Sequence, residues 1–370
     1  MREDWEYKEL GEVCDIYQPK TISNEMLVKG GKYPVYGANG TIGFYNRYNH
    51  TDSEILLTCR GATCGTINVS QPYSWINGNA MVIHRKSDYL DFKYLYFLMT
   101  SLDYSLIING AAQPQITRAR LAPIQVAIPP KPTQLSIVSE FDKLNELIQI
   151  KKEQLKDYDA LAQSIFYEMF GDPVENEKGW EVKELIETVS PECKISYGIV
   201  QPGEHVEDGV SIVRPVDMVS TFISKDGLKK TTKEISNSYS RTILSGKELL
   251  VCVRGTTGVV SLVDESLQGA NVTRGIAPLL FSENVERWFM YYQVKSSSVR
   301  GVISSLTRGI ALKQINMSDL RKIRLILPPL SLQQSFAHKI EQIERQKAAV
   351  QSTITDLETL LAARMQYWFD

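Results

Sequence analysis

The sequence predicts an α/β fold with a pseudo-twofold internal repeat, in which two α/β domains are joined by two long helices that form an antiparallel coiled coil. Two observations predict the duplication: Trp-Glu-Tyr-Lys-Glu-Leu at 5–10 recurs as Trp-Glu-Val-Lys-Glu-Leu at 180–185, and residues 115–171 align without a gap to 314–370. A third observation, the heptad spacing of apolar residues in both aligned segments, predicts the coiled coil. A repeat of roughly 200 residues is too long for a solenoid, so the repeated unit is a domain followed by a helix.

The duplication divides the chain into four segments. We expect a first α/β domain at 1–131, a first helix at 132–171, a second α/β domain at 172–330 and a second helix at 331–370. Within the domains, β-branched and aromatic runs between Gly- and Asn-rich turns predict strands at 54–58, 67–69, 80–83, 248–253, 259–263 and 321–327, and we expect shorter helices at 92–102 and 285–293.

Each long helix follows a double proline, which is tolerated at a helix start. The apolar seam steps alternately by four and three residues and includes Ile137, Phe141, Leu144, Ile148, Leu155 and Tyr158 in the first helix and Phe336, Ile340, Ile343, Val350, Ile354 and Leu357 in the second. At 1.5 Å per residue the first helix spans about 57 Å. This length favours pairing of the two helices with each other over the alternative, packing of each helix within its own domain.

The chain connectivity predicts the direction of pairing. The link at 172–180 is too short to run back along a long helix, so the two helices should be antiparallel. Lys151 and Lys347 also occupy seam positions, where they either fix the register or extend out of the seam.

The charge of the chain is close to balanced. It has 370 residues, with 41 Lys and Arg against 43 Asp and Glu, and 43% of them are hydrophobic. The composition excludes long-range disorder, and the balance excludes a sequence-blind DNA coat, which would be basic. The helices carry the acidic excess, whereas each globular segment has one more basic than acidic residue.

The sequence predicts a reduced, cytoplasmic protein without a metal site. It begins with an acidic, polar segment rather than a signal peptide, and no apolar run approaches the roughly 20 residues of a membrane span. Its five cysteines include no Cys-x-x-Cys, and its four histidines are scattered along the chain.

The loops of both domains are rich in side chains that suit nucleic acid. Asn and Arg can make bidentate contacts to base edges, and Lys suits phosphates. The candidate DNA contacts are Asn39, Arg47, Arg60, Asn77, Asn79, Arg118, Lys229, Lys230, Arg241, Arg254, Arg274 and Arg308. Each loop taken alone could be an ordinary turn, but such loops recur in both halves.

Two stretches resemble catalytic motifs but do not match them. The glycine-rich stretch at 37–43 lacks both G-x-G-x-x-G spacing and a Walker lysine. Asp172 with Glu181 and Lys183 suggests a metal-dependent nuclease, but the first half repeats only the Glu and Lys, so a repeated structural strand is the better interpretation. We therefore expect no catalytic residues in this chain.

The combination of repeated motifs resembles a known family over nearly the whole chain. The motifs are the Trp-Glu-x-Lys-Glu-Leu starts, Tyr36-Gly37-Ala38-Asn39-Gly40, the segments with Arg60, Gly61 and Gly65 and with Arg254, Gly255 and Gly258, the double prolines with their heptad helices, and the helix end at 166–172. Together they resemble the specificity (S) subunit of type I restriction-modification systems.

The resemblance implies two target recognition domains, each reading one half of a bipartite site in double-stranded DNA. It also implies two methyltransferase subunits docked around the helices, which bring S-adenosylmethionine and methylate adenine, and restriction/translocase subunits. The Arg-Gly segments either contact DNA or form a tight turn after a strand. The alternatives are a DNA-acting enzyme, a nuclease or methyltransferase with its own active site, and a helical scaffold without a DNA role.

Overall fold

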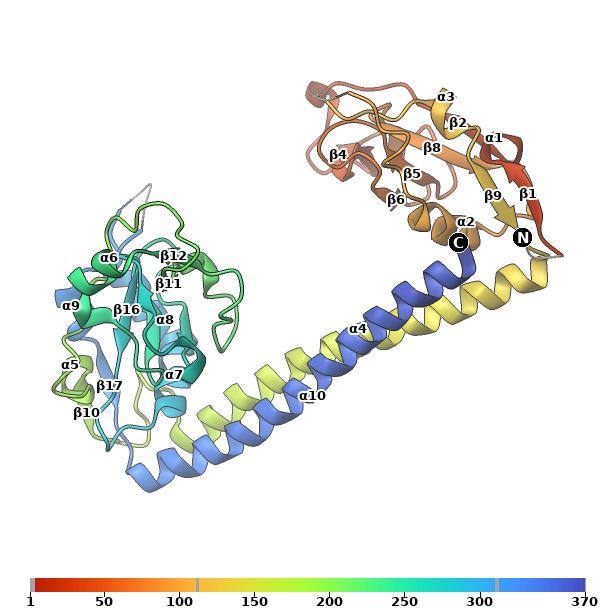
Figure 1. Cartoon of the computed structure of the whole chain (residues 1–370). Helices are drawn as coiled ribbons and strands as arrows, with labels where there is room; N and C mark the ends of the chain where they lie inside the picture. Colours follow the sequence, from red (N-terminus) through yellow and green to blue (C-terminus); the bar gives the residue numbers. More distant parts are fainter. Residues whose placement is uncertain (1–3, 111–112, 310–312, 370) are drawn as a thin grey trace. The chain divides into compact units, whose positions relative to one another are not determined.

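The computed structural model describes residues 4–110, 113–309 and 313–369 and divides the chain into two compact units. Unit 1 comprises residues 1–152 and 352–370, and unit 2 comprises residues 153–351. The two long helices, α4 (Lys131–Phe170) and α10 (Leu330–Phe369), each contribute to both units (Figure 1). Their bounds confirm the expected helices to within one residue. The boundary between the two compact units falls near the middle of each helix.

Unit 1 contains three sheets. A four-stranded antiparallel sheet has the order β2-β8-β5-β6, a three-stranded sheet has the order β4-β3-β7 with β3 and β7 parallel, and β1 pairs with β9. The strands are β1 (Glu6–Glu9), β2 (Cys14–Tyr17), β3 (Tyr33–Gly37), β4 (Gly40–Tyr45), β5 (Ile55–Thr58), β6 (Ile67–Val69), β7 (Trp75–Ile76), β8 (Ala80–Arg85) and β9 (Gln125–Ile128). The helices are α1 (Leu10–Val13), α2 (Phe92–Ser101) and α3 (Arg118–Leu121), with a 3-10 turn η1 (Asn24–Met26).

Unit 2 repeats this plan with additions. Its sheets have the orders β14-β13-β16, β12-β11-β15 and β10-β17. The strands are β10 (Val182–Glu184), β11 (Val210–Val213), β12 (Lys229–Thr231), β13 (Leu249–Cys252), β14 (Val260–Leu262), β15 (Asn271–Val272), β16 (Ile276–Leu279) and β17 (Arg324–Ile326). The helices are α5 (Leu185–Thr188), α6 (Lys233–Ser238), α7 (Arg287–Lys295), α8 (Ser297–Leu306) and α9 (Met317–Arg321), with 3-10 turns η2 (Pro215–Asp217), η3 (Ser240–Thr242) and η4 (Glu265–Leu267).

The two units correspond element by element. The antiparallel pair β5 and β8 matches β13 and β16, and the parallel pair β3 and β7 matches β11 and β15. The helices α2 and α7 correspond, each with an acidic N-cap residue, and α8 has no helical counterpart among residues 102–108. All six expected strands and both shorter helices are confirmed, with bounds that differ by up to three residues.

The rejected motifs are structural. The glycine-rich stretch at 37–43 forms the β3–β4 hairpin. Glu6 and Lys8 form an ion pair on β1, and Glu181 and Lys183 form the same pair at β10. The repeated strand is therefore confirmed.

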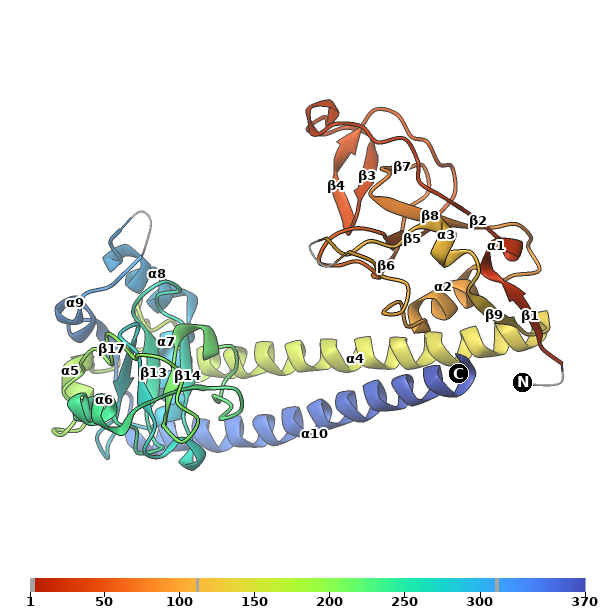
Figure 2. The same cartoon turned by 45° about the horizontal axis from the view of Figure 1, so that its top comes forward.

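The core of unit 1 lies between its main sheet and the long helices. Tyr94 and Leu95 of α2 are buried with Ile137 and Phe141 of α4, and Phe369 of α10 packs on Phe141. Figure 2 shows α2 next to the long helices, while the sheet of β3, β4 and β7 lies at the opposite end of the unit.

Unit 2 has an equivalent core. Phe166 and Phe170 near the end of α4 are fully buried against Phe289 of α7 and Phe336 of α10. Phe166 and Phe170 thus contact both a domain core and the partner helix, so packing within a domain and pairing between helices both occur at this end of α4.

The helices are antiparallel in each unit. In unit 1, Glu140 bonds Arg364 and Trp368, and Lys152 bonds Glu358 at 2.8 Å. In unit 2, Lys347 bonds Asp159 at 2.9 Å. Of the twelve expected seam residues, Leu155, Tyr158 and Leu357 are half-buried and the other nine are buried.

Lys347 stays in the seam rather than extending out of it. Its side chain is only 15% exposed, and its ammonium group lies 2.9 Å from Asp159 Oδ1 and 2.8 Å from Glu344 Oε1. These two carboxylates raise the pKa of Lys347 despite the opposing effect of burial.

Candidate nucleic-acid interface

Backbone hydrogen bonds hold the Arg-Gly segment of unit 1 at a corner of the chain. The N–H and carbonyl of Asn109 bond the carbonyl and N–H of Gln115 at 2.8 Å, and Gly61 N–H donates to the Pro114 carbonyl at 3.0 Å. Gly65 has φ +98° and donates to the Thr58 carbonyl, so the chain reverses just after β5. A residue with a Cβ is strained at this φ, which explains the glycine. Arg60 is exposed at this corner.

Unit 2 contains the same corner, in which the Arg-Gly segment makes the same backbone hydrogen bonds, but with different side chains. Arg308 and Gln314 exchange backbone hydrogen bonds of 2.8 and 2.9 Å, and Gly255 N–H donates to the Lys313 carbonyl at 2.8 Å. Gly258 has φ +84° and donates to the Cys252 carbonyl. The interpretation of the glycines as a tight turn after a strand is therefore confirmed.

Two of the candidate contacts meet at the unit 2 corner. Arg254 is half-buried and Arg308 is exposed, and both pair with the backbone of Gln314. The Arg308 guanidinium lies 3.6 Å from an Asp319 carboxylate oxygen, which orients it. Asn109 occupies the position of Arg308 in unit 1, so the same backbone presents an amide in one copy and a cation in the other.

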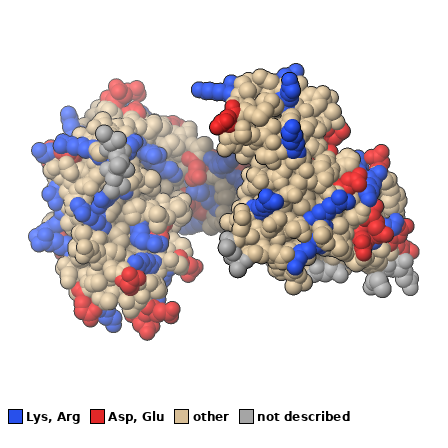
Figure 3. All heavy atoms as spheres, turned by 90° about the horizontal axis from the view of Figure 1, so that it is seen from above, with Lys and Arg blue, Asp and Glu red and all other residues tan. Residues whose placement is uncertain are grey.

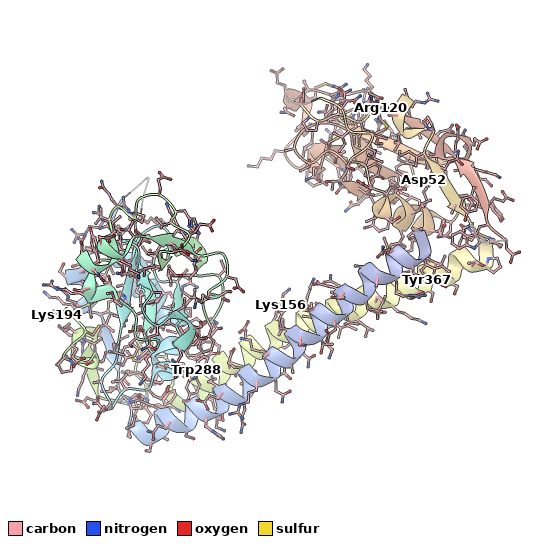
Figure 4. The ribbon with its side chains drawn as sticks, viewed as in Figure 1. Asp52, Arg120, Lys156, Lys194, Trp288 and Tyr367 are labelled. Carbon is pink, nitrogen blue, oxygen red and sulfur yellow. The ribbon has the colours of Figure 1, made fainter. Side chains whose placement is uncertain are left out.

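Several other candidates lie exposed on loops. In unit 1, Asn39 is in the β3–β4 turn, Arg47 follows β4, and Asn79 precedes β8. Arg118 begins α3, and Arg120, which sequence reasoning missed, is exposed on the same helix and lies at the side of the unit away from the long helices (Figure 4). The signal in the sequence that could have identified Arg120 is the pair of arginines in Arg118-Ala119-Arg120.

Two further exposed candidates belong to unit 2. Arg241 lies on η3, and Arg274 lies between β15 and β16. Both side chains are accessible to DNA, and their contact with DNA stays a prediction.

The prediction that Asn77 contacts DNA is wrong. Asn77 is only 3% exposed, its Oδ1 accepts a hydrogen bond from Ile22 N–H at 3.0 Å, and its Nδ2 donates to the Ile22 carbonyl. The amide holds the loop before η1 against the parallel strand pair, and its burial keeps it from a base edge.

Lys229 and Lys230 have other partners. The Lys229 ammonium donates to the Gly203 carbonyl at 2.8 Å, and the Lys230 ammonium donates to the Glu207 carbonyl at 2.6 Å. Both side chains are half-buried on β12 and hold the preceding loop. A phosphate contact from either lysine would require these bonds to break.

The surface charge is distributed unevenly within unit 2. Figure 3 looks onto the sides of the units that lie at the top of Figure 1, and on unit 2 the Lys and Arg side chains are spread over the middle of this face. Asp and Glu gather mainly at its edge. A face of this kind suits the phosphates of a nucleic acid.

Burial shifts the pKa values of two groups in unit 1, His50 and Glu54. His50 Nδ1 donates to Asn49 Oδ1 at 2.7 Å, and His50 Nε2 lies 2.9 Å from Tyr17 OH. Burial lowers the pKa of His50, which favours the neutral imidazole with Nε2 accepting from Tyr17 OH. Burial raises the pKa of Glu54, although His84 Nδ1, 3.0 Å from both of its oxygens, acts in the opposite direction.

The fold is that of known specificity subunits. The S subunit of the type I restriction-modification system from M. genitalium aligns over 99% of this chain and 96% of its own, with a TM-score of 0.54 and 12% identity. The family model of the type I restriction modification DNA specificity domain matches residues 2–157 and again 194–359.

The chain therefore belongs to the family of type I restriction modification DNA specificity domains and contains two copies of that domain. It is 26% identical over 160 residues to the specificity subunit of the type I restriction enzyme EcoBI of Escherichia coli, a match that covers 43% of this chain and 33% of that protein. It is 23% identical to a putative type I specificity subunit of Mycoplasma pneumoniae over 340 residues, which are 90% of this chain and 87% of that protein. None of the helices in the described part of the chain is long and apolar enough to span a membrane.

Proposed function

We propose that the chain is the sequence-specific DNA recognition subunit of a type I restriction-modification complex and reads an asymmetric bipartite site. The observation that supports this most directly is the pair of DNA specificity domains with the same corner but different exposed side chains. Since base edges are distinguished by hydrogen-bonding side chains, two different sets of side chains imply two different half-sites.

Co-expression with the methyltransferase subunit of the same restriction-modification system, followed by single-molecule methylome sequencing, tests this proposal. The expected result is adenine methylation in a motif of two unlike half-sites. Replacing residues 172–330 with the corresponding domain of another subunit should change one half-site and leave the other unchanged. Methylation without sequence preference would contradict the proposal.

The long helices are proposed to set the spacing between the half-sites. Each has 40 residues and therefore a length of about 60 Å. Inserting seven residues after Lys152 in α4 and seven after Gln351 in α10 preserves the heptad register and adds about 10 Å to each helix. At about 3.4 Å per base pair, the spacer should grow by roughly three base pairs with unchanged half-sites. An unchanged spacer would refute this role.

The chain is further proposed to have no catalytic centre and no cofactor of its own. Two methyltransferase subunits docked around the helices would bring S-adenosylmethionine, and restriction/translocase subunits would join for cleavage. The five cysteines are free thiols, as is usual for proteins of the reducing cytoplasm. Purified chain, incubated alone with DNA and either S-adenosylmethionine or Mg²⁺, should neither methylate nor cleave. Turnover by the chain alone would instead support the alternative, a DNA-acting enzyme with its own active site.

A further inference from the structure

A cleft of about 830 Å³ opens in unit 2 next to the corner that holds Arg254. Its wall is formed by the C-terminal part of α4, the first turns of α8 and the loop that follows Arg254. The side chains that matter for its chemistry are Gln163, Thr256, Lys295, Ser297, Arg300 and Lys313.

The lining of the cleft is cationic. Lys295, Arg300 and Lys313 line it together, and no carboxylate of the described residues does so. Arg300 and Lys313 are exposed and have no ion-pair partner in the part of the chain that the structure describes. Three like charges gathered without a counter-charge repel one another, so an anion in the cleft would be stabilised.

Lys295 is held in position. Its ammonium group donates to Tyr291 OH at 3.4 Å and lies 5.2 Å from the centre of the Tyr291 ring and 5.6 Å from that of Tyr292. It also borders a second cleft containing Asp159 and Glu344, but both of those carboxylates are bonded to Lys347. Lys295 therefore keeps its charge available for an anion.

The remaining polar side chains can all donate hydrogen bonds. Gln163 lines the cleft, although its Nε2 is buried and has no hydrogen-bond partner among the described residues. Thr256 and Ser297, whose hydroxyls can donate, are exposed beside it. A ligand rich in anionic oxygens would pair with the exposed cations and hydroxyls.

The position of the cleft favours the phosphodiester backbone of DNA over an acidic peptide. Gly255, which lines the cleft, directly follows Arg254 and donates to the carbonyl of Lys313. Lys313 in turn precedes Gln314, which pairs with Arg254 and Arg308. A strand whose phosphates entered the cleft would pass directly beside the candidate base contacts.

The described residues of unit 1 do not form this arrangement. Gly65 faces Tyr104 where Gly258 faces Ile303, and the segment before Tyr104 contains no counterpart of α8. Pro114 occupies the position of Lys313, and Thr100 that of Lys295. The cationic cleft thus belongs to one half of the repeat.

We infer that Lys295, Arg300 and Lys313 bind backbone phosphates of the DNA strand next to the half-site of unit 2. The inference rests on the proposed function as a DNA recognition subunit. It assigns unit 2 a larger share of the electrostatic affinity than unit 1 and gives these residues no part in choosing the sequence.

The test uses full-length chain in complex with its methyltransferase subunits. Arg300→Gln with Lys313→Gln removes two exposed cations, and Lys194→Gln with Lys247→Gln is the control with the same charge change, because both of those lysines are exposed and lie outside the cleft and the long helices. Fluorescence anisotropy gives the Kd for a duplex with the methylated motif and for a scrambled duplex at several KCl concentrations.

The cleft variant should lower the slope of log Kd against log[KCl] by about two and weaken binding to both duplexes by a similar factor, whereas the control should not. A second readout replaces single phosphates near the half-site by neutral methylphosphonates. One or two of these should weaken the wild type but not the cleft variant.

The outcomes separate the two proposals. Absence of any preference for the motif in the wild type would overturn the proposed function. A normal preference with an unchanged salt slope in the cleft variant would overturn this inference alone. Loss of the methyltransferase subunits with unchanged DNA affinity would also overturn it and would assign the cleft to a protein partner.

Discussion

Two glutamines at equivalent places in the repeat should each stabilise one unit. Gln134 is fully buried on α4; its Oε1 accepts a hydrogen bond from Asp91 N–H at 2.7 Å, and its Nε2 donates to the Pro129 carbonyl at 2.9 Å. Asp91 is the N-cap residue of α2. One amide therefore joins the first turn of the long helix to the start of the helix that covers the main sheet.

Gln333 does the same in unit 2. It is fully buried, accepts from Glu286 N–H at 2.9 Å and donates to the Pro328 carbonyl at 2.7 Å. Glu286 is the N-cap residue of α7. The two substitutions Gln134→Leu and Gln333→Leu therefore make the same change in each unit.

Leucine has nearly the volume of glutamine, so the packing should be preserved. The hydrogen bonds of the amide to its backbone partners should be lost. Two backbone groups in unit 1 and three in unit 2, where Gln333 Nε2 also donates to the Asn284 carbonyl at 3.4 Å, would lose their hydrogen bonds, at about 1–3 kcal/mol each, and the apolar side chain would offset part of that cost. We expect a net loss of about 2–4 kcal/mol in the free energy of unfolding. With a slope of about 2–3 kcal/mol per molar urea, the midpoint of the affected unit should fall by roughly 1 M.

Hydrogen exchange measured by mass spectrometry, together with urea titration, can assign the loss to a unit. Gln134→Leu should reduce protection in α2 and leave α7 unchanged, and Gln333→Leu should do the reverse. Gln149→Leu, on an exposed face of α4, is the matched control and should change stability by less than about 0.5 kcal/mol. If either buried substitution left its unit within that margin, the reasoning would be wrong.

Three further predictions concern charged and titratable groups. Because burial lowers the pKa of His50, its stabilising contribution is present above about pH 6.5 and is lost as the pH falls through the lowered pKa, so His50→Gln should flatten the loss of stability between pH 7 and pH 5 in thermal unfolding. Lys347→Leu should destabilise unit 2 by about 1–2 kcal/mol in urea titration because Glu344, 18% exposed, loses its cation, and adding Glu344→Leu should recover most of that loss. Glu140→Gln should weaken the bonds to Arg364 and Trp368, and hydrogen exchange should then show faster opening at the end of α10 but not at its start.

The long helices could be predicted closely because their signal is periodic and redundant. A heptad pattern over 40 residues with a proline pair before it determines an element almost without tertiary information. The packing at the ends of the helices was harder to predict, because Phe141 and Phe166 each contact the partner helix and a domain core through the same side chain. Apolar spacing does not distinguish these two kinds of burial.

The candidate site was predicted less well, for a physical reason. An exposed Asn in a turn and a buried Asn that holds a loop have the same local sequence, and only the long-range contact with Ile22 identifies Asn77 as the second kind. Similarly, Lys295 at the end of α7, Arg300 on α8 and Lys313 next to Gln314 meet at the cleft only in the folded chain, and no motif in the sequence joins them. Arg60 and Arg254 were found because the duplication repeated them.

The near-neutral charge of the chain is compatible with DNA binding because affinity depends on local charge. At physiological salt the Debye length is about 8 Å, so charges farther than that from a bound phosphate are largely screened. The acidic excess belongs to the long helices, while exposed cations such as Arg60, Arg300 and Lys313 lie on loops and helices of the domains. The isolated chain should therefore bind DNA weakly and with a strong dependence on salt, and its partners should supply further phosphate contacts.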